Sequence, residues 1–295
     1  MILVVGGTGF IGHHLIKRLR KDDLPVRAVV RTPAGAPALK ALGAEVVSGD
    51  IADPQSLKAA AEGVERIVHL VGIIQEAPGV TFQSVHVDGT RNLLNAAKKA
   101  GVRHIFYQSA LGTRINAKSR YHQTKWQAEE LVRASGIPFS ILRPSLIYGP
   151  GDLFTIRLSK MIKLWRVLPV IGSGRSKIQP IFIGDEVECV RKIVTSDSYV
   201  NGIYEIGGPE QLTYEEVMRE IAEAMGVKRP MVHMPLFFMK FVARVMEALL
   251  KKPLITTDQL IVLQEDNICG MRDIRGAFGI EPVTFRDGLR MFIGK

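Results

Sequence analysis

The stretch 1-MILVVGGTGFIG-12 joins an apolar run to three glycines, Gly6, Gly9 and Gly12, and a helix-like segment, HHLIKRLR, follows it. Glycine weakens regular structure, so three of them directly after a strand should serve a purpose that side chains would obstruct. In a strand–turn–helix unit the first glycine allows a tight turn, the second lets a pyrophosphate approach the backbone, and the third lets the helix pack against the sheet. The N–H groups and dipole of the helix then attract phosphate. The plain alternative is a strand-to-helix turn without a ligand.

The same alternation of strand and helix continues to residue 150. Apolar runs such as PVRAVV, RIVHLVG and RHIFYQSA alternate with helix-like stretches at residues 9–20, 36–42, 53–63, 82–100 and 121–135. These runs are too apolar for a sheet with one face open to water, so they predict a parallel sheet covered by helices on both faces. The fold class we expect is α/β, a Rossmann-type doubly wound sheet.

The regular alternation of strand-like and helix-like segments ends after Pro150, which predicts a second, smaller lobe. We expect a dinucleotide-binding domain over residues 1–150, with residues 178–200 returning to it. Residues 151–177 and 201–295 then form a smaller α/β substrate lobe. In open α/β sheets, ligands bind beyond the carboxyl ends of the strands, where such a lobe would lie.

Composition narrows the class of protein. The chain has 295 residues and a net charge of +10, and residues 1–150 hold 19 of its 39 basic residues but only 11 of its 29 acidic ones. This excess of positive charge favours an anionic ligand or surface, or is a solvated basic face.

Other classes of protein are not expected. We find no signal peptide and no apolar run long enough to span a membrane, and two distant cysteines fit a reducing cytoplasm. Histidines without ligand spacing predict no metal, and no nucleic-acid module is recognisable.

The end of the second predicted strand bears on cofactor choice. An NAD site usually has an acidic residue there to bind the ribose 2′-hydroxyl, but PVRAVVRTP has none and places Arg31 at that point. A cation suits a 2′-phosphate, so NADP(H) is favoured over NAD(H). Otherwise Arg31 is a surface arginine.

The segment SRYHQTKWQAEE contains Tyr121 and Lys125, spaced i,i+4. On a helix both lie on one face, and a nearby ammonium is expected to lower the pKa of the tyrosine toward neutrality. Such a tyrosine can exchange a proton with a substrate oxygen, and Ser109, at the end of the preceding strand, could bond the same oxygen. Alone, this spacing is common by chance on exposed helices.

Together these motifs resemble the extended or atypical branch of the short-chain dehydrogenase/reductase family, of the NAD-dependent epimerase/dehydratase type. The resemblance rests on GGTGFIG, SGDIAD, VHLVG, VHVDGTRNLL, the Ser109/Tyr121/Lys125 set and ILRPSLIYGPGD. It implies that Tyr121 is the acid/base and that Ser109 and Lys125 complete the catalytic set. The cofactor-binding residues that it implies are Gly6, Thr8, Gly9, Phe10, Ile11, Gly12, Arg31, Asp50, Ile51, Leu70, Val71, Gly72, Lys125, Pro144, Ser145 and Leu146.

More narrowly, SALGT, the Tyr121 segment and RPSLIYGPGD resemble the nucleotide-binding accessory subunits of respiratory complex I. Two functions follow from the resemblance. The first is an NADP(H)-dependent oxidoreductase in which Tyr121 works on an unidentified alcohol or carbonyl, or an epimerase-like enzyme that retains its cofactor. The alternative is a non-catalytic, NADP(H)-binding accessory or assembly protein of a larger complex.

Two further features concern partners. The segment at residues 236–250 has an apolar stripe that could pack on the small lobe, line a pocket, contact a partner or lie on a membrane surface. A homodimer through the helices at residues 82–100 and 121–135 is a further expectation from the resemblance.

Overall fold

The computed structural model describes residues 1–250 and 253–293, and it divides into two compact units. The first unit comprises residues 1–143 and 187–204, and the second comprises residues 144–186 and 205–295. The segment that returns to the first unit thus begins at Val187, whereas the sequence pattern suggested residue 178.

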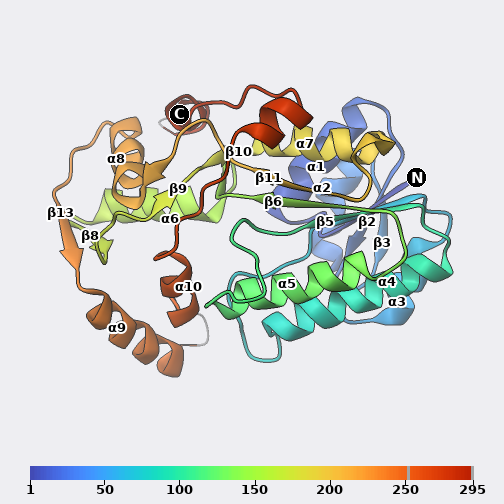
Figure 1. The fold of residues 1–295 in the computed structure, drawn as a ribbon, viewed down its shortest axis with the longest axis horizontal. Helices are drawn as coiled ribbons and strands as arrows, with labels where there is room; N and C mark the ends of the chain where they lie inside the picture. The colour runs from blue at the N-terminus through green and yellow to red at the C-terminus, as the bar shows by residue number, and fades with distance from the viewer. Residues whose placement is uncertain (251–252, 294–295) are drawn as a thin grey trace. The chain divides into compact units, whose positions relative to one another are not determined.

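A seven-stranded sheet forms the centre of the first unit (Figure 1). Its strand order is β11-β6-β5-β4-β1-β2-β3. The strands are β1 (Ile2–Val5), β2 (Val26–Val30), β3 (Glu45–Ser48), β4 (Arg66–His69), β5 (His104–Gln108), β6 (Phe139–Pro144) and β11 (Gly202–Ile206). Neighbouring strands from β3 to β6 pair in parallel. From β1 the chain adds β2 and β3 on one side, and it then adds β4, β5 and β6 on the other side, so the strand order switches between β1 and β4. Such a switch point opens a crevice for a ligand. The predicted Rossmann-type fold is confirmed.

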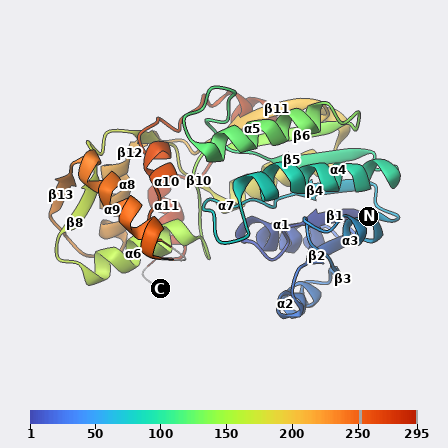
Figure 2. The same cartoon turned by 90° about the horizontal axis from the view of Figure 1, so that it is seen from below.

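Helices cover both faces of this sheet (Figures 1 and 2). One face carries α3 (Pro54–Ala61), α4 (Gly89–Lys99) and α5 (Arg120–Arg133), and the other carries α1 (Phe10–Lys21) and α7 (Ile183–Thr195). A short helix, α2 (Ala36–Ala41), precedes β3. An ion pair of 3.1 Å from Arg18 on α1 to Glu188 on α7 joins the two helices of the second face.

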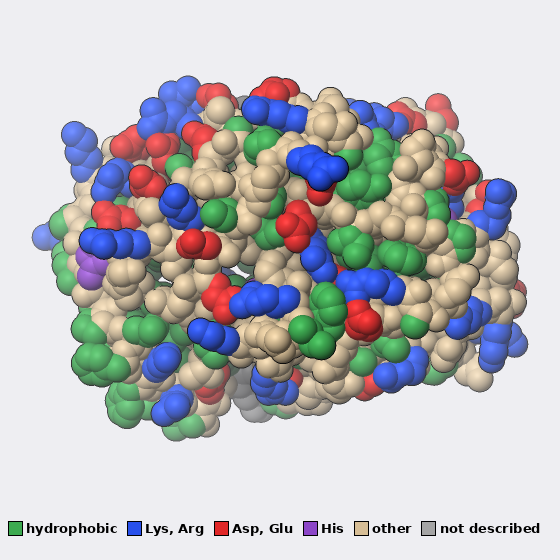
Figure 3. Space-filling view, viewed as in Figure 1, with side chains coloured by type: hydrophobic (Ala, Val, Ile, Leu, Met, Phe, Trp, Pro, Cys, Tyr) green, Lys and Arg blue, Asp and Glu red, His purple; other side chains and the backbone are tan. Residues whose placement is uncertain are grey.

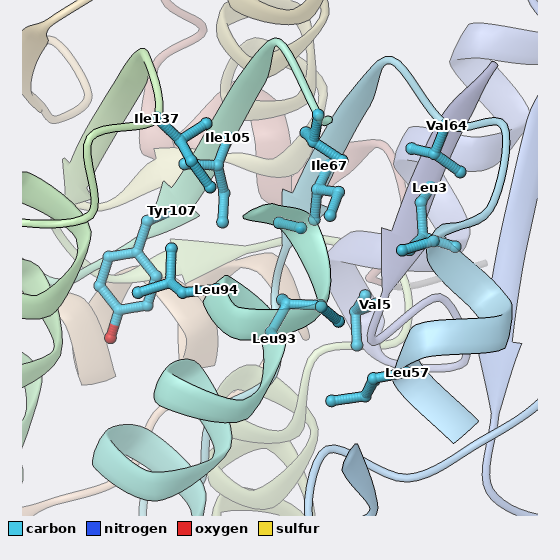
Figure 4. Packing of buried hydrophobic residues seen from close by; sticks show 14 of the residues in the cluster. Leu3, Val5, Leu57, Val64, Ile67, Leu93, Leu94, Ile105, Tyr107 and Ile137 are labelled. Atoms are coloured by element: carbon cyan, nitrogen blue, oxygen red, sulfur yellow. The ribbon is translucent and has the colours of Figure 1, made fainter. Parts of the chain in front are cut away.

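The core under α3 and α4 is largely aliphatic and also contains Tyr107 (Figure 4). Leu3 and Ile67 from adjacent strands meet Leu57 of α3 and Leu93 of α4, and all four side chains are fully buried. The strands can be apolar throughout because helices exclude water from both faces. Burying each such side chain contributes about 1.5–3 kcal/mol.

The helix predicted at residues 82–100 has a different start. Residues Gln83–Asp88 form a π-helical turn that leads into α4 at Gly89. Single π-helical turns are rare and frequently occur at functional sites. The apolar pattern of residues 82–100 does not distinguish this turn from ordinary α-helix.

The second unit contains pairs of short strands and several helices. The pairs are β7 (Ile147–Tyr148) with β10 (Ile181–Phe182), β8 (Leu168–Ile171) with β13 (Met231–Met234), and β9 (Lys177–Ile178) with β12 (Leu212–Thr213). The helices are α6 (Leu153–Leu164), α8 (Tyr214–Ala224), α9 (Leu236–Leu249), α10 (Thr257–Val262) and α11 (Phe285–Arg290). Tyr148, Val217, Ile221 and Phe285 form its core. Among the described residues, no helix combines the length and apolar character that a membrane span needs.

Candidate functional site

Each glycine of the first turn is required for a different reason. Gly6 has φ +102°, a left-handed conformation that side chains disfavour. A Cβ atom built on Gly12 would lie 2.3 Å from the carbonyl oxygen of Gly6, so only glycine lets α1 approach β1 this closely. A Cβ atom on Gly9 would contact only the Gly6 oxygen, at 3.2 Å. The position of Gly9 is otherwise open, as a ligand-facing position requires.

The start of α1 is suited to an anion. Gly9 is the N-cap residue in extended conformation, no side chain caps the helix, and its first turn holds no acidic residue. The first N–H groups of α1 therefore have no side-chain acceptor, and the helix dipole adds positive potential there. Thr8, Phe10 and Ile11 complete the turn. This backbone fits the pyrophosphate of a dinucleotide, which it would hold through N–H groups.

Residues at the ends of β2 and β3 lie next along the same sheet edge. Arg31 follows β2, is exposed, and forms no ion pair within the part of the chain that the structure describes. Asp50 accepts a hydrogen bond of 2.8 Å from the N–H of Ala52, which fixes the turn after β3. Ile51 is buried against Gly89, where a Cβ atom would lie 2.6 Å from its side chain.

Two buried histidines hold the loop after β4, which contains Leu70, Val71 and Gly72. The N–H of Val71 donates to His69 Nδ1 (3.3 Å), and the N–H of Ile73 donates to His86 Nε2 (3.0 Å). Each accepting nitrogen must be unprotonated, so the other ring nitrogen carries the proton. Burial, with the charge of Lys125, lowers the pKa of His69 to about 3 and of His86 to about 2, so both stay neutral at pH 7.

His86 also connects this loop to helix α5. Its Nδ1 donates to Thr124 Oγ1, 2.9 Å away, and its ring stacks on Phe82 with centroids 5.5 Å apart. The ring of Tyr121 meets His86 edge-on at 5.6 Å. The π-helical turn that carries His86 is therefore a bridge between the predicted cofactor loop and the predicted catalytic helix.

Tyr121 and Lys125 lie one turn apart on α5. Lys125 is buried, donates to the Gln108 carbonyl oxygen at 2.5 Å, and lies 4.5 Å from the centroid of the Tyr107 ring. A Cβ atom built on Gly72 would be 3.7 Å from Lys125 Nζ, so the ammonium abuts the loop after β4. The structure thus brings the predicted lysine and the predicted cofactor loop together.

The expected direction of the Tyr121 pKa was wrong. Burial raises the pKa of Tyr121 to about 12, and it lowers the pKa of Lys125 to about 7 although Glu129 opposes that shift. The spacing of Tyr121 and Lys125 indicates the effect of the lysine charge but not the cost of burying both groups. Tyr121 is therefore a protonated phenol at neutral pH.

Ser109 lies at the end of β5, but its hydroxyl points to a residue that the sequence argument missed. Its Oγ donates to Glu129 Oε1 at 2.5 Å. Glu129 is fully buried and is bridged by Arg143 through bonds of 2.9 and 2.7 Å, and by Arg133. The predicted donation from Ser109 to a substrate oxygen has no support in this geometry and stays a prediction.

Spacing could have revealed one of the missed residues. Glu129 follows Lys125 by four residues, so it continues the helix face that carries Tyr121 and Lys125. His86 offered no such signal, because a lone histidine in an apolar helix pattern is usually a core residue.

Pro144, Ser145 and Leu146 open the second unit. Pro144 ends β6, the N–H of Ser145 donates to Ile206 O at 2.8 Å, and Leu146 O accepts from the N–H of Ile181 at 2.8 Å. Their placement beside a nicotinamide stays a prediction. Among residues 1–250 and 253–293 there is no cluster of three or more side chains suited to hold a metal ion.

Comparison with known proteins agrees with this geometry. Residues 6–152 match the NAD(P)H-binding family, and residues 104–201 match the male sterility protein family. Ceramide reductase of Caulobacter vibrioides is 33% identical over 237 residues, which cover 80% of this chain and 74% of that protein. The chain belongs to the extended short-chain dehydrogenase/reductase family. It is thus a member of a family of NAD(P)-binding oxidoreductases.

Two other similarities qualify the expectations. Subunit 9 of the 1 alpha subcomplex of mitochondrial NADH dehydrogenase from Arabidopsis thaliana is 29% identical over 221 residues, 72% of this chain and 55% of that protein. This identity is lower than that to ceramide reductase, so the chain has no special similarity to subunits of complex I. The NADPH-dependent quinone oxidoreductase QOR2 of Escherichia coli, solved with NADPH, shares the fold over 99% of both chains with a TM-score of 0.77 and 23% identity.

Proposed function

We propose that this protein is an NADP(H)-dependent reductase of a carbonyl group on an apolar substrate. The observation that carries the proposal is the position of Lys125. Its buried Nζ lies 3.7 Å from the place that a Cβ atom on Gly72, in the loop after β4, would occupy, and Lys125 follows Tyr121 by one helical turn. A purely structural nucleotide site has no need of a proton donor and a buried cation at this point.

The protonation state of Tyr121 is compatible with reduction. NADPH, when bound, supplies a hydride to the carbonyl carbon. Tyr121, with its pKa raised to about 12 by burial, holds a proton at pH 7 that it can donate to the carbonyl oxygen. The alcohol then carries both the added hydrogen and the proton, and Lys125 in its protonated form, which is about half populated at pH 7, stabilises the phenolate that is left.

NADP(H) is the cofactor that we propose over NAD(H). Arg31 is exposed at the end of β2, and Ser48, which pairs with the preceding Val30, is not acidic. An arginine here can bind a 2′-phosphate through two parallel hydrogen bonds, and an acid that would bind a free 2′-hydroxyl is missing from β2 and its end. Replacing Arg31 with aspartate should shift the preference toward NADH.

The second candidate is an accessory protein that holds NADP(H) without turnover. Two observations favour it: the Ser109 hydroxyl is committed to Glu129, and subunits of mitochondrial complex I are among the relatives. The ceramide reductase relative supports the enzyme and an apolar substrate instead.

Turnover and binding of two variants separate these candidates. Tyr121→Phe keeps the ring contacts with His86 and Phe82 but removes the proton donor. With NADPH and a panel of long-chain ketones, aldehydes and quinones, we expect its kcat to fall about 10²–10⁴-fold while the Kd for NADPH is unchanged. Lys125→Met should lower kcat and weaken NADPH binding. Bound NADPH that no panel member oxidises, with Tyr121→Phe indistinguishable from wild type, would establish the accessory role.

A further inference from the structure

Helix α9 of the second unit is apolar on two sides. Its inner side packs through Ala243, which is fully buried. Its outer side exposes Phe237 by 77%, Phe241 by 65% and Leu249 by 77%. Spacings of four and eight residues put these three on one face of the helix. This face, completed by Phe238 and Val245, is called the α9 stripe below.

The charges beside the α9 stripe are positive. Lys240 and Arg244 are exposed, lie one turn apart, and form no ion pair within residues 1–250 and 253–293. The one acid of the helix, Glu247, accepts hydrogen bonds from the N–H and hydroxyl of Thr257 at 2.9 and 3.0 Å, so it is engaged with the start of α10. Figure 3 shows hydrophobic side chains together with Lys and Arg over α9, at the lower left.

A stripe of this size rarely stays in water, because exposed aromatic side chains favour burial. A second copy of the chain is a poor occupant. Pairing two α9 stripes would bring four cations together in a protein whose net charge is already +10. Phenylalanine and leucine on one face with lysine and arginine at its edge are the features of a helix that lies in a membrane interface. Negative lipid headgroups complement the cations.

We propose that the α9 stripe lies on the surface of a bilayer that contains anionic lipid, with the phenylalanine rings between the headgroups. The helix is then a peripheral anchor. This inference is independent of the proposed reaction, because it concerns the outer face of α9 and requires neither NADP(H) nor turnover.

Vesicle flotation with the full-length protein tests it. The vesicles are phosphatidylcholine alone, or phosphatidylcholine with about 30% phosphatidylglycerol. We expect binding to the second kind only, and loss of that binding with added salt. The double variant Phe237→Ser/Phe241→Ser should bind at least about tenfold more weakly. Lys240→Gln and Arg244→Gln should each weaken binding about fivefold, the value of one cation near such a surface.

Ile115→Ser is the matched control. Ile115 is 70% exposed in the first unit, so this variant removes an equally exposed apolar side chain away from α9. It should bind vesicles as the wild type does. Three outcomes overturn the proposal: wild-type protein that floats with neither vesicle, serine variants that still float, or a wild-type dimer that the serine variants convert to monomer. Circular dichroism confirms that each variant is folded.

Discussion

The two units differ in which side chains they bury and which they expose to solvent. In the first unit, three polar side chains at the candidate site are buried and paired: His69 and His86 with backbone N–H groups, and Glu129 with arginines. In the second unit, aromatic side chains such as Phe237 and Phe241 are exposed. Buried, paired polar groups specify one geometry, as a site that positions a cofactor needs. An exposed apolar stripe specifies a surface that another phase or molecule must cover.

The largest effect that would test this contrast lies in the glycine turn. Gly12→Val should strongly destabilise the first unit, because its side chain would overlap the Gly6 carbonyl group, 2.3 Å from the Cβ position. We expect a loss of more than about 4 kcal/mol in unfolding free energy, measured by urea denaturation. Gly9→Ala is the milder comparison, because its Cβ atom would lie 3.2 Å from the Gly6 oxygen rather than 2.3 Å, and it should lower that free energy by only about 1 kcal/mol. Equal losses for both variants would contradict the account.

The paired polar cluster is next in size. Glu129→Gln removes the charge that Arg143 and Ser109 contact, and it leaves a largely buried guanidinium without a counter-charge. The unfolding free energy should fall by about 3 kcal/mol. Glu130→Gln, on the exposed neighbouring position, should change it by less than about 1 kcal/mol. A loss no larger than that of the control would show that the cluster contributes little.

Acid should reveal the neutral histidines. Their pKa values of about 2 and 3 in the folded chain lie below the ordinary 6.5, so the unfolded chain binds more protons as the pH falls below 6.5. Stability is therefore present above pH 6.5 and is lost toward pH 3. His86→Asn should reduce the slope of unfolding free energy against pH by about 1.4 kcal/mol per unit in this window. An unchanged slope would mean that His86 is already protonated or solvated.

The smallest effect is expected on α9. Phe241→Ser should change the unfolding free energy by less than about 0.5 kcal/mol, because its ring is mostly in water. Ile221→Ala, in the core of the same unit, should cost about 2–5 kcal/mol. A large loss for Phe241→Ser would show that α9 packs on the protein and would weaken the argument for an anchor.

The sequence predicted the first unit better than the second, for physical reasons. Three glycines and the Tyr121–Lys125 spacing are local patterns, and local patterns follow from the geometry of one turn or one helix. Other contacts depend on packing between elements that are distant in sequence. Examples are the hydrogen bonds of His86 with Ile73 and Thr124, and the hydrogen bond from Ser109 to Glu129. The Tyr121 pKa depends on burial, which spacing does not report. In the second unit, the sequence of the α9 stripe is equally compatible with a buried core helix. Periodicity shows that one face of a helix is apolar, but it does not show which neighbour covers that face.

The central claim is that the turn around Gly9 holds the pyrophosphate of NADP(H) against the start of α1. Titration of the protein with NADPH, followed by the fluorescence of the reduced nicotinamide, tests it most directly when wild type and Gly9→Val are compared. The account predicts saturable binding of one NADPH per chain to the wild type, and at least about tenfold weaker binding to a Gly9→Val variant that remains folded. Equal affinity in the two proteins, or no saturable binding to the wild type, would contradict it.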